Sequence, residues 1–192
     1  RNSEWPWSDG KVFTVLDNEI FQYPDTPVYS TDLYTKYAVD FVSKSKSTTN
    51  PFFLYLSYTA PHWPLHAPEE DITKYLGKYM IGWDSLRQER YERQLDMGLF
   101  EHPWELPPPY DGYRPWVSLS DKEKKEYDRK MAVYAAMIDR MDQNIGKLIT
   151  ALETNGQLEN TIIMFLSDNG GCAAGYISYL HERFDQDAPV GS

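Results

Sequence analysis

Two short segments of the chain carry residue types that can do chemistry. The first, TIIMFLSDNGG at 161–171, is an apolar run that ends in Asp168, Asn169 and two glycines. Carboxylate and amide oxygens are the hard donors that Ca²⁺ and Mg²⁺ prefer, and glycine lets a ligand approach the backbone closely. The same pattern is also typical of a simple tight turn, in which Asp and Asn side chains bond the local backbone. The residues alone leave both interpretations open.

The second segment, TAPHWPLHAP at 59–68, places His62 between Pro61 and Pro64. Prolines restrict the backbone around the imidazole, which titrates near neutral pH and suits proton transfer. An isolated histidine in a proline-rich loop is more commonly structural or exposed, so that alternative also stays open. His66, two residues beyond Pro64, is expected to be peripheral. His102 and His181 have no partner in the sequence pattern and are expected at the surface.

Two apolar runs lead into these segments and are predicted to be strands. PFFLYLSY at 51–58 is continuous and rich in aromatic residues, which indicates a strand buried on both faces, and TIIMFL at 161–166 indicates the next one. Helices that alternate with such strands are typical of an α/β fold with a largely parallel sheet. Sites collect beyond the carboxyl ends of parallel strands, so His62 and Asp168 are expected to converge at one edge of the sheet if the strands are parallel neighbours.

Three helices are expected to flank this sheet. The first spans YSTDLYTKYAVDFVSKS at 29–45, with Thr31 as its N-cap. The second, WDSLRQERYERQLDMGL at 83–99, carries so many charges that it should be a solvated surface helix. In the first helix, the apolar residues at helical spacing are Leu33, Tyr34, Tyr37, Ala38 and Phe41.

The third helix is the longest clear element and covers residues 121–155. Ser120 and Glu123 form a capping box at its start, and Asn155-Gly156 ends it. The apolar residues on one face are Tyr134, Ile138, Met141, Ile145, Leu148 and Leu152, and the methionines there are core filler. KVFTVL at 11–16 suggests a short strand, and the five prolines within 102–116 predict an extended loop.

Composition sets limits on the kind of protein. With 192 residues, of which 41% are hydrophobic, the chain is long enough to bury a sizeable core. Its net charge of −10 repels phosphate backbones, so nucleic acid is not an expected partner. No run reaches the roughly 18 apolar residues of a membrane span. Cys172 is the only cysteine, which excludes an internal disulfide and leaves the compartment undetermined.

Three stretches resemble one protein family. They are PFFLYLSYTAPHWPLHAP, GKYMIGWDSLRQERYERQLDMGL and MAVYAAMIDRMDQNIGKLITALETNGQLENTIIMFLSDNGG, which follow one another in the family's order. Together they look like the central part of an arylsulfatase, a type I sulfatase of the alkaline phosphatase superfamily. The resemblance implies an α/β fold with a largely parallel mixed sheet flanked by helices. It also implies that residues 1–192 form only part of a sulfatase catalytic domain. A start without Met and an end soon after SDNGG also suggest a fragment.

The resemblance assigns roles to the two segments. Asp168 and Asn169 match the family's ligands of a divalent cation, usually Ca²⁺ with Mg²⁺ possible. His62 matches the histidine that contacts the sulfate ester and is thought to protonate the departing oxygen. The implied substrate is a small-molecule or carbohydrate sulfate ester, with the alcohol unspecified.

The chain also departs from the family pattern. Sulfatases use a formylglycine made from the Cys or Ser of a C/S-x-P/A-x-R motif, and residues 1–192 contain no such motif. Cys172 begins CAAGY, which lacks the arginine, so it is expected to be an unmodified thiol. The alternatives are a phosphodiesterase or phosphonate hydrolase of the same superfamily, or a non-catalytic remnant. Alone, the chain is expected to hydrolyse no sulfate ester and to bind Ca²⁺ weakly.

Overall fold

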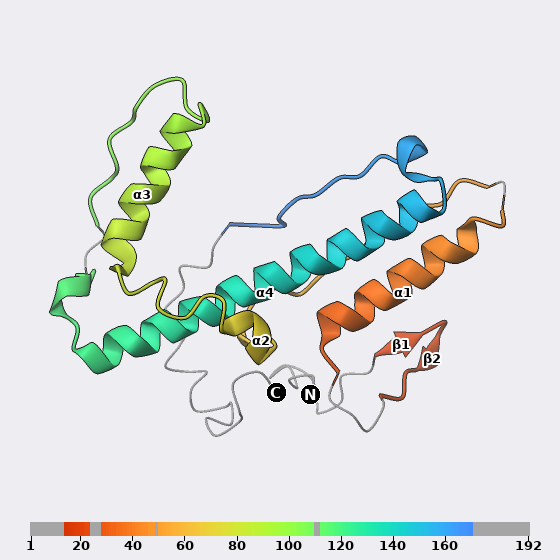
Figure 1. The fold of residues 1–192 in the computed structure, drawn as a ribbon, viewed down its shortest axis with the longest axis horizontal. Helices are drawn as coiled ribbons and strands as arrows, with labels where there is room; N and C mark the ends of the chain where they lie inside the picture. The colour runs from red at the N-terminus through yellow and green to blue at the C-terminus, as the bar shows by residue number, and fades with distance from the viewer. Residues whose placement is uncertain (1–13, 24–27, 49, 110–111, 171–192) are drawn as a thin grey trace. The chain divides into compact units, whose positions relative to one another are not determined.

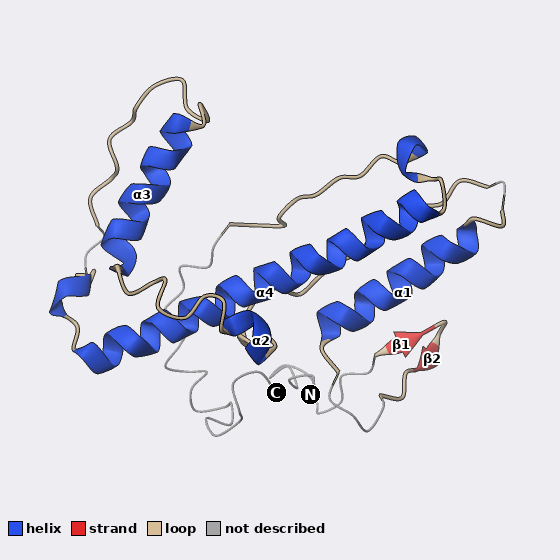
Figure 2. Ribbon diagram, in the orientation of Figure 1, coloured by secondary structure: helices blue, strands red, loops and turns tan. Residues whose placement is uncertain are grey.

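The computed structural model describes residues 14–23, 28–48, 50–109 and 112–170. The chain divides into two compact units, one made of residues 1–64 with 140–192 and the other of residues 65–139. Figure 1 follows the chain through its elements, and Figure 2 shows that helix dominates them. No helix among the described residues has the length and apolar character needed to cross a membrane.

The described residues of the first unit contain one small sheet. Strands β1 (Val15–Leu16) and β2 (Glu19–Ile20) pair antiparallel, with Val15 opposite Ile20. Asp17 and Asn18 connect them with φ angles of 52° and 69°. Two residues with positive φ make the turn that suits a two-residue hairpin, and Asp and Asn tolerate that conformation. The predicted strand at 11–16 is therefore found at its last two residues, and its first three lie outside the described part of the chain.

Helix α1 (Ser30–Ser45) runs beside the C-terminal half of helix α4 (Asp121–Thr154), in the same direction (Figure 1). Near one end, the Asp32 carboxylate accepts hydrogen bonds from Arg140 and Asn144. At the other, Asn155 and Gln157 donate to the Val42 carbonyl and the Ser45 hydroxyl. The buried residues of α1 recur at helical spacing and form one face: Thr31, Thr35, Ala38 and Val42.

Two predictions for α1 were wrong in detail. The N-cap is Tyr29, which makes no side-chain capping bond, and Thr31 lies inside the helix. Phe41 was placed in the apolar stripe but is 46% exposed. The buried face of α1 contains Thr31 and Thr35 and is therefore more polar than the predicted apolar stripe. Thr35 can be buried because its hydroxyl donates to the Thr31 carbonyl at 2.8 Å. A satisfied hydroxyl can be buried at little cost.

The two apolar runs 51–58 and 161–166 are extended but are not strands in this structure. A β-strand exists only where its backbone pairs with a neighbour, and the only paired strands in the described part of the chain are β1 and β2. The prediction that both runs are strands was therefore wrong for this structure. The largely parallel sheet stays unconfirmed.

The second unit contains helix α2 (Glu69–Ile72), helix α3 (Gly82–Asp96), the 3₁₀ turn η1 (Trp116–Ser118) and α4 up to Asp139. An aromatic cluster joins three of them, with the Trp83 ring edge-on to Trp116 at 4.9 Å and to Tyr127 at 5.3 Å. Gly82 has φ +87°, and a Cβ there would overlap the Trp116 ring at Cγ. Only glycine fits this close approach.

Carboxylate side chains also connect the segment between α2 and α3 to helix α4. Asp128 is 6% exposed and accepts hydrogen bonds from the backbone N–H groups of Gly77 and Tyr79 at 2.8 and 2.9 Å. Lys74 reaches Asp71 at 2.6 Å and Asp139 at 3.0 Å. These hydrogen bonds, that to Asp71 foremost, raise the pKa of Lys74 to about 12. Helix α3 is a solvated helix as predicted, since Gly82 is its one buried residue.

Both ends of α4 confirm the predictions made from the sequence. Glu123 accepts hydrogen bonds from the backbone N–H and hydroxyl of Ser120, and the Ser120 hydroxyl accepts one from the Glu123 N–H. Arg114 foremost, with Ser120, lowers the pKa of Glu123 to about 2. At the other end Gly156 has φ +72° and closes the last turn. After the short 3₁₀ turn η2 (Leu158–Asn160), the chain continues into the run 161–166.

Candidate active site

His62 is exposed and lies on a turn that follows the run 51–58. Its backbone N–H donates to the Thr59 carbonyl at 2.9 Å, and the flanking bonds Ala60–Pro61 and Trp63–Pro64 are both cis. The imidazole Nδ1 lies 2.6 Å from the Trp63 carbonyl oxygen, and the two rings are 5.1 Å apart. A carbonyl oxygen only accepts, so Nδ1 is the donor. In the neutral ring the proton therefore sits on Nδ1.

Asp168 and Asn169 form a local turn whose side chains bond the nearby backbone. Asp168 Oδ1 accepts from the Asn169 N–H at 2.9 Å, and the Asn169 amide donates to the Gly170 carbonyl at 2.8 Å. The Ser167 hydroxyl donates to the Asn169 carbonyl at 2.6 Å. Both Asp168 and Asn169 are exposed. The turn anticipated as the alternative to a metal site is thus formed.

These two residues also fit a hard cation by donor type, because each presents a side-chain oxygen to solvent. The side-chain oxygens of two residues are few, since Ca²⁺ takes about 6 to 8 oxygen ligands. No group of three or more His, Cys, Asp or Glu side chains suited to a metal occurs among the described residues. Asp168 and Asn169 as metal ligands, like the convergence of His62 with Asp168, stay predictions.

The remaining histidines and the cysteine have different surroundings. His66 is half-buried, and burial foremost lowers its pKa. His102 is exposed, as expected. His181 and Cys172 lie outside the described residues.

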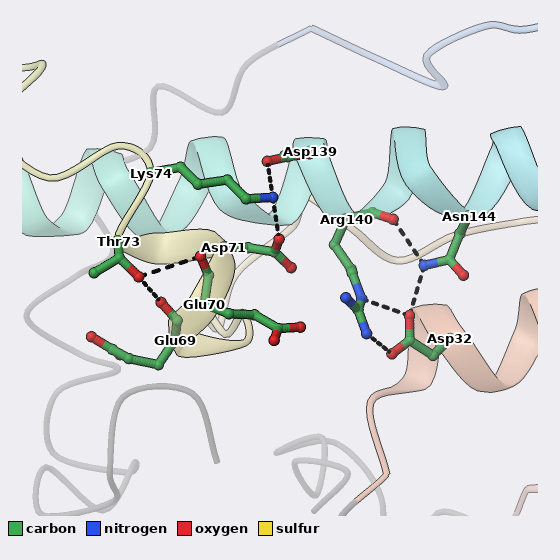
Figure 3. A network of polar contacts seen from close by, with 9 residues as sticks. All are labelled: Asp32, Glu69, Glu70, Asp71, Thr73, Lys74, Asp139, Arg140 and Asn144. Carbon is green, nitrogen blue, oxygen red and sulfur yellow. Dashed lines mark hydrogen bonds and ion pairs between the residues drawn. The ribbon is translucent and has the colours of Figure 1, made fainter.

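Sequence reasoning missed the polar network on α1 and α4. Asp32 on α1 accepts from Arg140 Nε at 2.9 Å, from Arg140 Nη2 at 2.8 Å and from Asn144 at 2.7 Å (Figure 3). Burial tends to raise the pKa of Asp32, but the hydrogen bonds from Arg140 and Asn144 outweigh it and hold the pKa below its usual range. Arg140 and Asn144 lie four residues apart and therefore on one face of α4. No local pattern points from them to Asp32, which is 108 positions away from Arg140.

A comparison with protein families decides what kind of chain carries this site. The family model described as Sulfatase matches residues 2–188. The chain belongs to the sulfatase family. This membership also places it in the alkaline phosphatase superfamily, and the resemblance inferred from the three sequence stretches is thereby confirmed.

Individual sulfatases share substantial identity with the chain. It is 43% identical over 144 residues to an uncharacterized sulfatase of Schizosaccharomyces pombe, covering 74% of this chain and 26% of that protein. It is 34% identical over 159 residues to the arylsulfatase of Klebsiella aerogenes, covering 83% of this chain and 34% of that one. The chain thus spans about a quarter to a third of the length of these relatives.

A solved structure, that of Ps i-CgsB in complex with k-i-k-neocarrahexaose, is also similar. It shares 26% sequence identity and covers 73% of this chain and 20% of that chain, with a TM-score of 0.39. A similarity at that TM-score supports no statement about the arrangement of the fold. The alkaline phosphatase-like fold class therefore rests on the family match.

Proposed function

We propose that this chain is part of a sulfuric ester hydrolase, in which His62 protonates the departing oxygen and Asp168 with Asn169 bind Ca²⁺ or Mg²⁺. The observation that carries the proposal is the sulfatase family match over residues 2–188, which includes all three residues. The identity with the arylsulfatase of Klebsiella aerogenes supports sulfate esters as the substrate class.

The chemistry of ester cleavage explains why these residue types are needed. Negative charge grows on the bridging oxygen as the sulfur–oxygen bond breaks, and a proton donor stabilises it. His62 is exposed, and its Nδ1 is bonded to the Trp63 carbonyl, so the imidazolium would donate from Nε2. A bound divalent cation would supply positive charge beside the sulfate oxygens. Asp168 and Asn169 would hold it there, which makes the −10 net charge of the chain compatible with an anionic substrate.

The nucleophile of the proposed reaction is a formylglycine that lies outside residues 1–192. None of these residues forms the C/S-x-P/A-x-R motif from which formylglycine is made. Cys172 is expected to be an ordinary thiol. Mass spectrometry of the peptide that contains Cys172 tests this directly, and the mass loss that accompanies conversion to formylglycine would overturn the assignment.

The chain alone should bind Ca²⁺ weakly and turn over no aryl sulfate. Asp168 and Asn169 supply only a few side-chain oxygens, so waters would have to complete the coordination shell. Calorimetric titration of residues 1–192 measures the affinity, and Asp168→Asn is the matched variant. Submicromolar binding would show that the chain already holds a complete metal site. Turnover of a chromogenic aryl sulfate that vanishes in His62→Ala would show that a nucleophile is present.

The proposed function itself is tested on the protein translated from the complete reading frame around these codons. A frame that contains C/S-x-P-x-R, with hydrolysis of aryl sulfates, supports the proposal. Preference for phosphate diesters or phosphonates would assign the chain to the related hydrolases instead. A frame without the motif and a protein without either activity would favour a non-catalytic remnant.

The role of His62 has a sharper signature than loss of activity. In that protein, His62→Ala should lower kcat by about 10²–10⁴-fold for aryl sulfates with poor leaving groups. The loss should shrink for acidic phenols, which depart without a proton. His102→Ala, which removes another exposed histidine, is the control and should leave kcat unchanged. An equal loss of kcat for all leaving groups would contradict the role as proton donor.

A further inference from the structure

The segment that leads to His62 is fixed to helix α1 at two points. Along 51–58 the exposure alternates, with every second side chain half-buried. Phe52 on the half-buried side lies edge-on to Phe41 of α1, with ring centroids 6.3 Å apart. Tyr58, also half-buried, bonds to Thr35 of α1 at 2.7 Å. The segment therefore runs back along α1 toward the start of that helix.

The direction of the Tyr58 hydrogen bond follows from the partners of Thr35. Thr35 is 1% exposed and its hydroxyl donates its one proton to the Thr31 carbonyl at 2.8 Å. The Thr35 oxygen can then only accept from Tyr58, so the Tyr58 O–H is the donor. Burial foremost, with the charge of Asp32, raises the pKa of Tyr58. The phenol therefore keeps the proton that this bond requires over the whole neutral range.

His62 is close along the chain to this bond. Between Tyr58 and His62 the chain makes one turn, closed by the bond from the His62 N–H to the Thr59 carbonyl. The imidazole is in turn directed by its own Nδ1 bond to Trp63. The Tyr58–Thr35 hydrogen bond, one residue before this turn, thus fixes the backbone that carries the imidazole.

We infer that Tyr58 and Thr35 are positioning residues for His62, and that the partly buried hydrogen bond between them holds the imidazole in one orientation and one tautomer. The meaning of that orientation for catalysis rests on the proposed function, in which His62 donates a proton from Nε2. The hydrogen bond itself belongs to this chain and does not depend on the metal or on the nucleophile.

The test is nitrogen-15 NMR of the histidine rings in the uniformly labelled 192-residue chain, with signals assigned by His→Gln replacement. Unmodified His62 should show the pattern of a single neutral tautomer with the proton on Nδ1. Tyr58→Phe and Thr35→Val should each lose this single-tautomer pattern, so that the Nδ1 and Nε2 signals of His62 move toward their average. The double variant should go no further than either single variant, because both remove the same bond. Thr35→Ser keeps the hydroxyl and should retain the pattern.

Two matched controls separate positioning from general destabilisation. Tyr55→Phe removes a phenol hydroxyl from the same segment, but Tyr55 is 80% exposed, so His62 should be unaffected. His102 lies in the other unit and serves as an internal reference. An unchanged His62 pattern in Tyr58→Phe, equal change at His62 and His102, or averaged tautomers in the unmodified chain would each overturn the inference. Loss of sulfatase activity would leave it standing and bear only on the proposed function.

Discussion

The two units of the chain satisfy their apolar and polar groups to different degrees. In residues 65–139, the aromatic cluster around Trp116 is packed and Asp128 pairs with two backbone N–H groups. In the other unit, Phe53 and Tyr55 are 83% and 80% exposed, and the run 162–166 has exposures of 51–89%. A helix satisfies its own backbone, whereas a strand needs a neighbour. The backbone of the helices in residues 65–139 therefore needs no strand neighbour, whereas the two apolar runs of the other unit pair with no strand among the described residues.

The largest effect is expected from a substitution in the packed unit, Gly82→Ala. Its Cβ would overlap Trp116 Cγ on a backbone with φ +87°. The left-handed conformation costs about 1–2 kcal/mol and the overpacking about 1–3 kcal/mol, so the free energy of unfolding should fall by about 2–5 kcal/mol. Urea denaturation measures it.

Gly77→Ala is the matched control for that substitution. Gly77 has φ +83°, but a Cβ added there would meet nothing within 4 Å, so only the backbone strain remains. The expected loss is about 1–2 kcal/mol. Equal losses for the two variants would show that the contact with Trp116 contributes nothing.

Asp128→Asn should have the next largest effect. The amide nitrogen would face one of the two backbone N–H groups, of Gly77 or Tyr79, that the carboxylate now accepts from. Leaving a buried donor unsatisfied costs about 1–3 kcal/mol. Glu126→Gln, which weakens an exposed pair with Lys130, should cost less than about 1 kcal/mol. If the two variants unfolded at the same urea concentration, the hydrogen bonds from Gly77 and Tyr79 to Asp128 would not be stabilising the unit.

The first unit should lose stability in acid through Asp32. Its pKa is lowered in the folded state, so its stabilising contribution is complete above the unfolded value near pH 4 and is lost as pH falls through the folded pKa. Asp32→Asn should remove about 1 kcal/mol near neutral pH and flatten the pH dependence below about pH 4. Urea midpoints from about pH 2.5 to pH 7 test this. An unchanged acid slope would contradict the role of the Arg140 and Asn144 bonds.

The smallest effect on folding is expected in the exposed apolar run. Phe53→Ser should change the free energy of unfolding by less than about 0.5 kcal/mol, because the side chain is 83% exposed. It should also reduce self-association, which light scattering measures, since exposed apolar runs aggregate. Phe52→Ser, which removes the edge-on contact with Phe41, should cost more. A large loss of stability in Phe53→Ser would show that the run is covered in solution.

The three long helices and both ends of α4 could be predicted because their signals are local. The Ser120–Glu123 capping box and the end of α4 at Asn155-Gly156 were found as expected, and the solvated helix predicted at 83–99 spans Gly82–Asp96. The side chains that pack were predicted less well. Ile138 is 39% exposed whereas Met137 is buried, since the buried direction depends on what lies against the helix.

The sequence by itself determined the family and the candidate residues His62, Asp168 and Asn169, because these lie in motifs that can be read along the chain. Tertiary structure alone decided that Tyr58 donates to Thr35 and that Asp32 pairs with Arg140, residues 23 and 108 positions apart. It also decided that the runs 51–58 and 161–166 are extended without being strands. The reason is the range of the interactions. Caps and turns are satisfied within a few residues, whereas buried hydrogen bonds and strand pairing depend on which distant segments come together.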